Sequence, residues 1–473
     1  MLGIRPASFG WGALVSAALV VGGIPGASAQ YGGYGGEIAP VGQYKEGIPI
    51  GVWTLYPSIF AGAVYDDNTS QLTGHNSGYS ARLVPNLSAI WNTGTHQTTL
   101  YGVADARFFD TNTVSATTGI SHSYEPTRDV ILNFKVDYTR QTDIFTSALN
   151  FNNGAIGPPT GSPATSVPLF INPFGTTPSV NPIAYNQFTA AGYATKKFGA
   201  DDRGFVTVGG AAYYLAFDHQ VDLAPLGPLV TPFQTSHDGA NYQASARIGY
   251  HVAPSVYVFA DGSGIFQRFN NGLFDTNGYR VTGGIGSDDP RSLLTGEIYG
   301  GYQAQHGFND QVLSPQGLAT LGIPVLSPSA LGIPVTSGIP QNTDSPVFGG
   351  RIYYFPTRRW TLVAQVDEVL GIATILDPTV PAGTPTRTIT ALLQTNYAIS
   401  QVLSVGARLG YTRGSFIGID RLDNGYMAGA SLNYEIWRNL KATLDYQYST
   451  VYSTAAMSDF TRNLYTAGVT YKY

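Results

Sequence analysis

The sequence predicts an all-β protein, a closed antiparallel transmembrane β-barrel of about 18 strands, with about 16 as the alternative count. Three observations support this fold class. Residues 463–473 alternate between apolar or aromatic side chains and small or polar ones, and they end on an aromatic residue. Charged residues make up only 12% of the chain, yet the mean hydropathy is close to zero, at -0.01. After residue 50, runs of strand length alternate with turns to the end of the chain.

The N-terminus predicts export. Arg5 is the only charged residue before an apolar run at 11–24, and Ala27 and Ala29 offer a small-x-small cleavage site. This pattern is typical of a secretory signal peptide. A transmembrane anchor is the weaker interpretation, because about 20 apolar residues are needed to span a bilayer and Pro25 ends this run early. We therefore expect a signal peptide at 1–29, a periplasmic linker at 30–50 and the barrel at 51–473.

The composition fits a barrel better than a soluble domain. About 25% of the residues are charged in an average soluble protein, whereas this chain is rich in Gly (57) and Tyr (31) instead. Lipid-facing and lumen-facing residues alternate in a barrel, which keeps the hydropathy of each window average. The chain has no cysteine, which excludes disulfides and thiolate metal sites. Its 30 acidic and 25 basic residues exclude an electrostatic nucleic-acid binder.

The first five strands have the clearest alternation. The second, at 79–91, begins and ends with Tyr79 and Trp91 on its apolar face, as expected for a strand that crosses between two interfaces. The fifth, from 130, alternates apolar outward residues with polar inward ones. The others are expected at 52–65, in a run that ends near 108, and at 113–124.

Short turns predict the rest of the topology. They are expected at 92–95, 125–128, 199–203, 253–255, 286–290, 356–359, 400–401 and 436–439. These eight turns join sixteen strands in pairs, and the opening and closing runs bring the total to eighteen. The strands near 186–195 and 346–355 have interrupted alternation. Since outer-membrane barrels have short periplasmic turns and long extracellular loops, we expect the short turns in the periplasm.

Two long segments, 145–182 and 307–345, are rich in Pro, Gly, Asn, Ser and Thr and predict loops. The second contains a short duplication, in which 321–327 recurs as 331–337. This repeat is explained either by a surface loop that expanded, which we favour, or by an apolar constriction or lid at the mouth of the barrel.

Two segments of the chain resemble known sequences. Gly468, Tyr471 and Tyr473 look like the C-terminal signal that the barrel-assembly machinery reads in bacterial outer-membrane β-barrels. Residues 51–60 and 65–68, which include Tyr56, Pro57, Asp66, Asp67 and Asn68, resemble the opening strand of the putative β-barrel porin 2 family. This resemblance implies a porin-like barrel in the bacterial outer membrane, in contact with lipid and lipopolysaccharide. Some relatives lie in exopolysaccharide operons, which implies polymer export as an alternative. No functional residues are established for the family that could be carried over to this sequence.

The charged residues of the lumen are the best candidates for a functional site. Strand by strand, the inward parity selects Arg82, Arg107, Lys135, Arg247, Arg280, Arg351, Arg408, Lys441, Lys472, Asp105, Asp137, Asp261, Glu297, Asp367, Glu435 and Asp445. Most of these are expected to pair across the wall and to hold the barrel together. Rings of charge that stay unpaired would set the selectivity of a pore, and the basic surplus favours anions.

The sequence predicts no catalytic or cofactor site. The seven histidines are scattered, and no metal, nucleophile-elbow or phosphate-loop motif occurs. Ser236, His237 and Asp238 are consecutive, so their side chains point in different directions and cannot form a triad. The Asp66, Asp67, Asn68 corner could ligate calcium, although we favour a corner that satisfies its own backbone through Asx turns.

Three function classes remain. A channel for passive passage of small polar or anionic solutes comes first, because it needs only a hydrated polar wall. A polysaccharide exporter comes second and would stack sugar rings on inward aromatics such as Tyr101, Tyr214 and Tyr299. A structural or adhesive barrel closed by its long loops is third.

Overall fold

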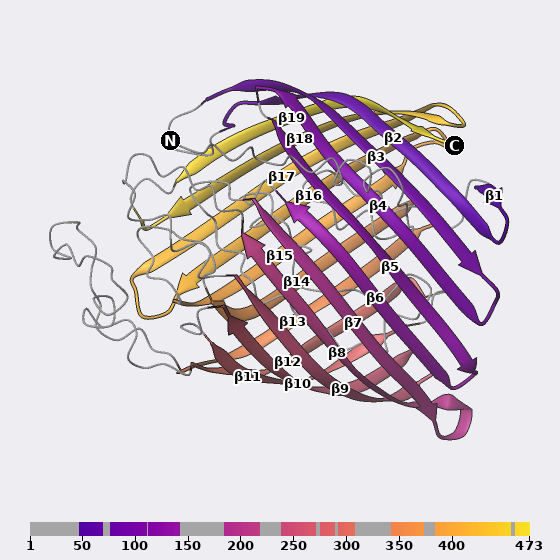
Figure 1. Cartoon of the computed structure of the whole chain (residues 1–473), viewed down its shortest axis with the longest axis vertical. Coiled ribbons are helices and arrows are strands. Elements are labelled where there is room, and N and C mark those ends of the chain that lie inside the picture. Colours follow the sequence, from indigo (N-terminus) through magenta and orange to yellow (C-terminus); the bar gives the residue numbers. More distant parts are fainter. Residues whose placement is uncertain are drawn as a thin grey trace, which may run out of the picture.

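The computed structural model shows one closed β-barrel (Figure 1). It describes residues 47–69, 76–110, 112–141, 184–217, 238–270, 275–288, 292–307, 342–372, 384–455 and 459–473. The expected signal peptide, most of the expected linker, residues 145–182 and the duplication lie outside these ranges. Within them, no helix is long and apolar enough to cross a bilayer.

Each long strand of the described chain pairs antiparallel with its neighbour in sequence. The strands are β2 (Trp53–Asp66), β3 (Gly78–Asn92), β4 (His96–Phe109), β5 (Thr113–Thr127), β6 (Val130–Gln141), β7 (Tyr185–Phe198), β8 (Gly204–Phe217), β9 (Gly239–Ala253), β10 (Val256–Phe269), β11 (Thr276–Ser287), β12 (Leu294–Gly307), β13 (Asn342–Thr357), β14 (Trp360–Ile372), β15 (Pro385–Ala398), β16 (Leu403–Phe416), β17 (Arg421–Trp437), β18 (Leu440–Ser453) and β19 (Phe460–Lys472). Since β19 also pairs antiparallel with β2, these eighteen strands close the wall.

The eighteen-strand count of the sequence is confirmed. The eight expected short turns fall between successive strands at one end of the barrel, where β7 and β8 are joined by the 3-10 turn Ala200–Asp202, and residues 289–291 of the β11–β12 connection lie outside the described ranges. Both irregular segments, 186–195 and 346–355, are strands, β7 and β13. Connections at the other end, called the loop end below, vary more: 110–112 and 417–420 are as short as turns, whereas 142–184 and 308–341 are long.

A short strand, β1 (Ile48–Ile50), lies within the segment expected to be a linker. It pairs with Trp53–Leu55 of β2, on the edge that β19 no longer covers. The amide N–H of Tyr473 donates to the carbonyl oxygen of Pro57 at 3.2 Å, which ends that pairing. In Figure 1 the C-terminus and β1 accordingly lie at the same end of the barrel.

The two faces of the wall differ in chemistry. On β6, Leu132, Phe134 and Val136 are exposed, whereas the intervening Asn133 is buried and Lys135 is half-buried. The same alternation recurs around the barrel, with exposed aliphatic and aromatic side chains outside and buried Thr, Asn, Gln, Arg and Asp inside. A soluble protein would place these two sets the other way round, so the outer face suits lipid and the inner face suits water.

Within the described residues, the wall parts between β13 and β14. Cα partners of β13 and β14 run from Thr357↔Trp360 only to Gly349↔Asp367, so residues 342–348 of β13 have no partner on β14 within the described chain. On its other side, β14 stays paired with β15 to Ile372↔Pro385. The loop-end part of β14 therefore leaves the line of the wall.

Orientation can be tested on the two ends of the barrel. We expect Asp420→Cys, between β16 and β17, to react with an impermeant maleimide on intact cells, because the loop end should face outward. Arg128, in the β5–β6 turn, is also exposed, and Arg128→Cys should react only after the outer membrane is permeabilised. Labelling of Arg128→Cys alone on intact cells would reverse the orientation.

Candidate functional site

The candidate site is the inner face of the barrel. Arg247 on β9 donates from Nη1 to Glu297 Oε2 on β12 at 2.9 Å, past two intervening strands. Gln303 on β12 donates from Nε2 to the carbonyl oxygen of Leu370 on β14 at 2.9 Å, past β13. Side chains from non-neighbouring strands can converge like this only on the concave side of a closed sheet, so this face is the lumen.

Most of the expected lumen charges lie on this face in pairs. Arg82 donates from Nη2 to Asp105 Oδ2 at 2.7 Å, from β3 to β4. Arg408 on β16 makes two 2.8 Å bonds to the carboxylate of Asp445 on β18. Lys135 lies 3.4 Å from Asp137 on its own strand. These pairs tie neighbouring positions of the wall together, and their charges largely cancel.

A cluster of buried aromatic side chains lies on the inner face. We call it the aromatic cluster, and it consists of Phe205, Tyr257, Phe259 and Tyr299 from β8, β10 and β12. The guanidinium carbon of Arg247 lies 4.2 Å from the centre of the Phe259 ring. Arg247 also donates to Asp261 at 2.6 and 2.7 Å, so that its fully buried charge has two carboxylate partners.

Each ring of the aromatic cluster lies over a glycine of the next strand. The directly opposed pairs are Phe205↔Gly249, Tyr257↔Gly286, Phe259↔Gly284 and Tyr299↔Gly349. A Cβ at any of these glycines would lie 2.1 to 2.7 Å from the ring. Glycine is therefore required at these positions by close approach, and the rings can lie flat against the wall.

A second chain of contacts leads away from the aromatic cluster. Tyr299 donates from its hydroxyl to Asp367 Oδ1 at 2.8 Å, and the Arg280 guanidinium lies 5.3 Å from the centre of its ring. Gln365 donates from Nε2 to Asp367 Oδ2 at 2.6 Å and accepts from Arg351 Nη2 at 2.6 Å. Arg280 bonds to Gln303 and Arg351 to Gln365, both neutral partners, and the two guanidinium groups share Asp367 as a nearby carboxylate.

The remaining charged residues and two tyrosines were also expected to face the lumen. Arg107 is buried on β4, and Glu435 faces Lys441 in register near the β17–β18 turn, while Lys472 lies near the end of β19. Tyr101 lies inward, with Lys135 Nζ 5.8 Å from its ring centre. The expectation for Tyr214 is wrong: its side chain is 39% exposed on the outer face, whereas its neighbour Tyr213 is 1% exposed and inward.

The Asp66, Asp67, Asn68 corner bonds to the first residues of β19. Arg462 donates to both oxygens of Asp66 at 2.5 to 3.0 Å. Asp67 accepts from the amide N–H and from Nδ2 of Asn463 at 2.6 and 2.7 Å. Asn68 Nδ2 donates to the Thr461 carbonyl oxygen at 2.9 Å. The corner therefore fastens the seam between the first and last strands.

The corner contains the kind of local hydrogen bond that the Asx-turn interpretation predicts. The amide N–H of Asn68 donates to Asp66 Oδ1 at 3.1 Å, which is the expected Asx-type bond. Both carboxylates are engaged by protein donors, and within the described residues no group of three or more His, Cys, Asp or Glu could hold a metal ion. A seam between the first and last strands follows from the predicted closed barrel, but the pairing of Arg462 with Asp66 across it was not expected, because the two residues are 396 positions apart.

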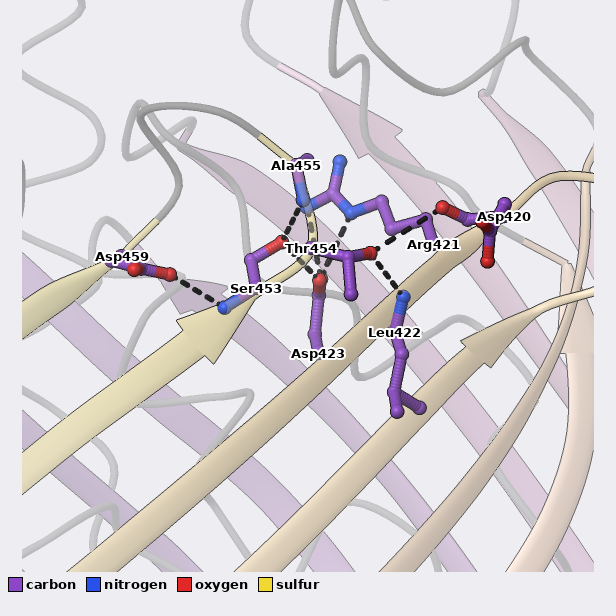
Figure 2. A network of polar contacts seen from close by, with 8 residues as sticks. All are labelled: Asp420, Arg421, Leu422, Asp423, Ser453, Thr454, Ala455 and Asp459. Carbon is purple, nitrogen blue, oxygen red and sulfur yellow. Dashed lines mark hydrogen bonds and ion pairs between the residues drawn. The ribbon is translucent and has the colours of Figure 1, made fainter.

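A further polar network continues from the seam along the loop end (Figure 2). Arg421 donates to Asp423 at 2.9 to 3.2 Å, and both side chains are buried. Ser453 on β18 donates from Oγ to Asp423 Oδ1 at 2.5 Å, while its amide N–H donates to Asp459 at 2.6 Å. Sequence parity alone did not single out Arg421 or Arg462. Arg421 directly follows Asp420 at the start of β17, and an acidic–basic pair at the end of a strand is the sequence signal that could have identified it.

The terminal residues lie at the opposite end of β19. Tyr471 and Tyr473 are about half exposed, on the outer face and at the end of the strand. Gly468 faces inward beneath the Phe60 ring, where a Cβ would lie 2.5 Å from the ring. The seam is thus stabilised by the packing of the Phe60 ring on Gly468 as well as by hydrogen bonds.

Comparison with known proteins gives a family match. The family model described as putative beta-barrel porin 2 matches residues 42–321 and 342–473. No curated protein matches the chain. The chain is similar in structure to OccAB3 from Acinetobacter baumannii, at 8% identity, a TM-score of 0.43, and coverage of 90% of this chain and 100% of that one. It is also similar to OpdL from Pseudomonas aeruginosa, at 12% identity, a TM-score of 0.40, and coverage of 89% and 99%.

The seam predicts a coupled pair of stability effects. Asp66→Ala should lower the free energy of unfolding by about 3–5 kcal/mol, because it leaves the buried Arg462 guanidinium without its carboxylate. Arg462→Ala should cost a similar amount, and the double variant should cost clearly less than the sum. Urea unfolding in detergent, followed by the heat-modifiable shift in gel mobility, measures all three. Strict additivity would show that the two side chains do not interact.

The aromatic cluster predicts that one added methyl group is costly. In Gly349→Ala, the new Cβ would lie 2.3 Å from the Tyr299 hydroxyl oxygen and 2.9 Å from Asp367 Oδ1. Overpacking of this kind costs about 1–3 kcal/mol, which would appear as a lower midpoint of urea unfolding. Gly262→Ala is the matched control, because nothing lies within 4 Å of its Cβ position. Equal midpoints for the two variants would contradict the packing described here.

Proposed function

The chain belongs to the putative beta-barrel porin 2 family, and from this premise we propose that it is a channel for the passive passage of small polar solutes. Family membership indicates a porin-like β-barrel in the outer membrane. The finer assignment, to a channel with no chemical step, rests on one observation. The inner face of the barrel carries polar and charged side chains, while the outer face carries exposed apolar ones.

The inner face supports hydration more than strong charge selection. Arg82, Arg247 and Arg408 each contact a carboxylate directly. Paired charges present a smaller net field to a passing ion than a ring of unpaired charges would. Arginines that are paired in this way contribute little to charge selection, and we propose at most a modest preference for anions.

Polysaccharide export receives less support from the described residues. Stacking of sugar rings needs aromatic faces that a polymer can reach. Tyr299 is 8% exposed and lies on Gly349, and Tyr214 lies on the outer face. Tyr101 likewise packs against Gly119. Inward aromatics here serve the packing of the wall.

We also propose that the orientation and assembly follow the outer-membrane pattern. The short turns would face the periplasm and the long connections the exterior, with lipid and lipopolysaccharide around the outer face. Gly468, Tyr471 and Tyr473 would form the signal read by the barrel-assembly machinery, since they lie on the strand that closes the seam.

Conductance tests the proposed function. Purified protein in a planar bilayer should conduct KCl with a reversal potential close to that of a weakly selective pore. The residual preference should weaken at high salt, because the Debye length contracts from about 10 Å at 0.1 M to about 3 Å at 1 M. Protein heated until it loses its folded gel mobility is the control. A folded protein that never conducts would refute the passive channel.

A further inference from the structure

The parting between β13 and β14 has a definite internal structure. Beyond Asp367, β14 is held by side chains in place of a strand neighbour on the β13 side. Gln303 and Gln305 both donate from Nε2 to the Leu370 carbonyl oxygen, at 2.9 and 3.3 Å, and Arg280 Nη1 lies 3.4 Å from the Glu368 carbonyl oxygen. Since these donors come from the lumen face of β11 and β12, the end of β14 lies on the inner side of β13.

Glu368 is the unusual residue of this segment. It follows the inward Asp367 and, by alternation alone, would point at lipid. Instead it is 0% exposed, and Ser345 Oγ, on the inner face of β13, lies 3.5 Å from its Oε1. The departure of β14 from β13 thus turns a carboxylate into the interior.

Among the described residues, Arg387 is the one cation in direct contact with the Glu368 carboxylate. Its Oε1 accepts a hydrogen bond from Arg387 Nε on β15. The Arg387 side chain is 42% exposed, whereas that of Glu368 is fully buried. A partly hydrated guanidinium is a weak partner for a carboxylate that has lost its own hydration. A buried carboxylate of this kind favours a second positive group.

Three buried oxygens at this place have no hydrogen-bond partner. They are Glu368 Oε2, Gln305 Oε1 and Thr343 Oγ1, on residues that are 0%, 2% and 6% exposed. Gln305 and Thr343 are directly opposed in register, and Ser345, two residues on from Thr343, reaches Glu368. The three residues therefore lie in one part of the wall, on β12, β13 and β14, and a buried polar group without a partner needs an explanation.

The chemistry of these oxygens selects one class of ligand. The carboxylate and amide oxygens can only accept hydrogen bonds, and the threonine hydroxyl oxygen can accept them as well as donate one. A primary ammonium group has three N–H donors and one positive charge, so it matches both the three acceptors and the buried carboxylate. A water molecule offers only two donors and no charge. A calcium ion would need six to eight oxygen ligands.

We propose that Glu368, Gln305 and Thr343 bind the primary ammonium group of a solute that enters the lumen. This inference rests on the proposed function, because a solute must enter the lumen to reach the site. It names amine-bearing solutes as a class that the channel binds. Entry to the site requires the end of β14 to move. Within the described residues, side-chain bonds replace the backbone ladder on the β13 side of that end, so its movement would break no strand pairing with β13.

The test uses a donor-bearing and a donor-free cation on the full-length protein. In a planar bilayer in KCl, n-butylammonium should interrupt the current of the wild type, whereas tetramethylammonium, which has the same charge and no N–H, should not. Glu368→Gln should raise the half-blocking concentration of n-butylammonium about tenfold or more, because a hydrogen bond to a charged group is lost. Thr343→Val should raise it by a smaller factor, and Thr117→Val should not change it.

Thr117→Val is the matched control because Thr117 is also inward and 6% exposed, but its hydroxyl is bonded to Thr139 at 2.7 Å. Calorimetric titration of n-butylammonium into the detergent-solubilised protein gives a readout that needs no open pore. Binding without conductance would refute the channel and keep the site. Conductance without binding, equal block by both cations, or block that is unchanged in Glu368→Gln would overturn the site and indicate that water satisfies these oxygens.

Discussion

The whole structure depends on closure of the sheet. A bilayer interior offers no hydrogen-bond partners to the backbone, so a β-sheet can span it only without free edges. Here the last strand pairs with the first from Leu464↔Asp66 to Lys472↔Ser58. Side chains of the Asp66, Asp67, Asn68 corner fasten the loop end of this seam, Phe60 on Gly468 packs its middle, and β1 covers the edge that remains at the turn end.

Closure also determines the character of the inner face. Curvature brings inward side chains of non-neighbouring strands within reach of one another, as in the 2.9 Å bond from Arg247 to Glu297. Crowding on this face is relieved by glycines opposite the aromatic rings, and charge is balanced by direct ion pairs. The lumen is therefore a stabilised polar wall, in which the region where β14 bends inward gathers three unpartnered oxygens beside a buried carboxylate.

The sequence predicted the fold well because strand period and turn chemistry are local. It predicted the eight short turns and the inward parity of Arg82 and Asp105 for that reason. The sequence did not predict features for which the alternation is ambiguous or that depend on contacts between distant segments of the chain. Tyr213 and Tyr214 are identical neighbours, so alternation could not tell which one faces inward. The bend at Glu368 and the pairing of Asp66 with Arg462 depend on strands that meet only in the closed barrel.

Register at the seam is the most direct test of this account. Ala63 and Ala467 are Cα partners across β2 and β19, whereas Ala63 and Tyr465 are two positions out of register. Cysteines at 63 and 467 should form a disulfide under mild oxidation in the outer membrane, because directly opposed residues meet the distance limits of that bond. Cysteines at 63 and 465 should stay reduced. A disulfide in the shifted pair alone, or in neither pair of a folded barrel, would contradict the closure described here.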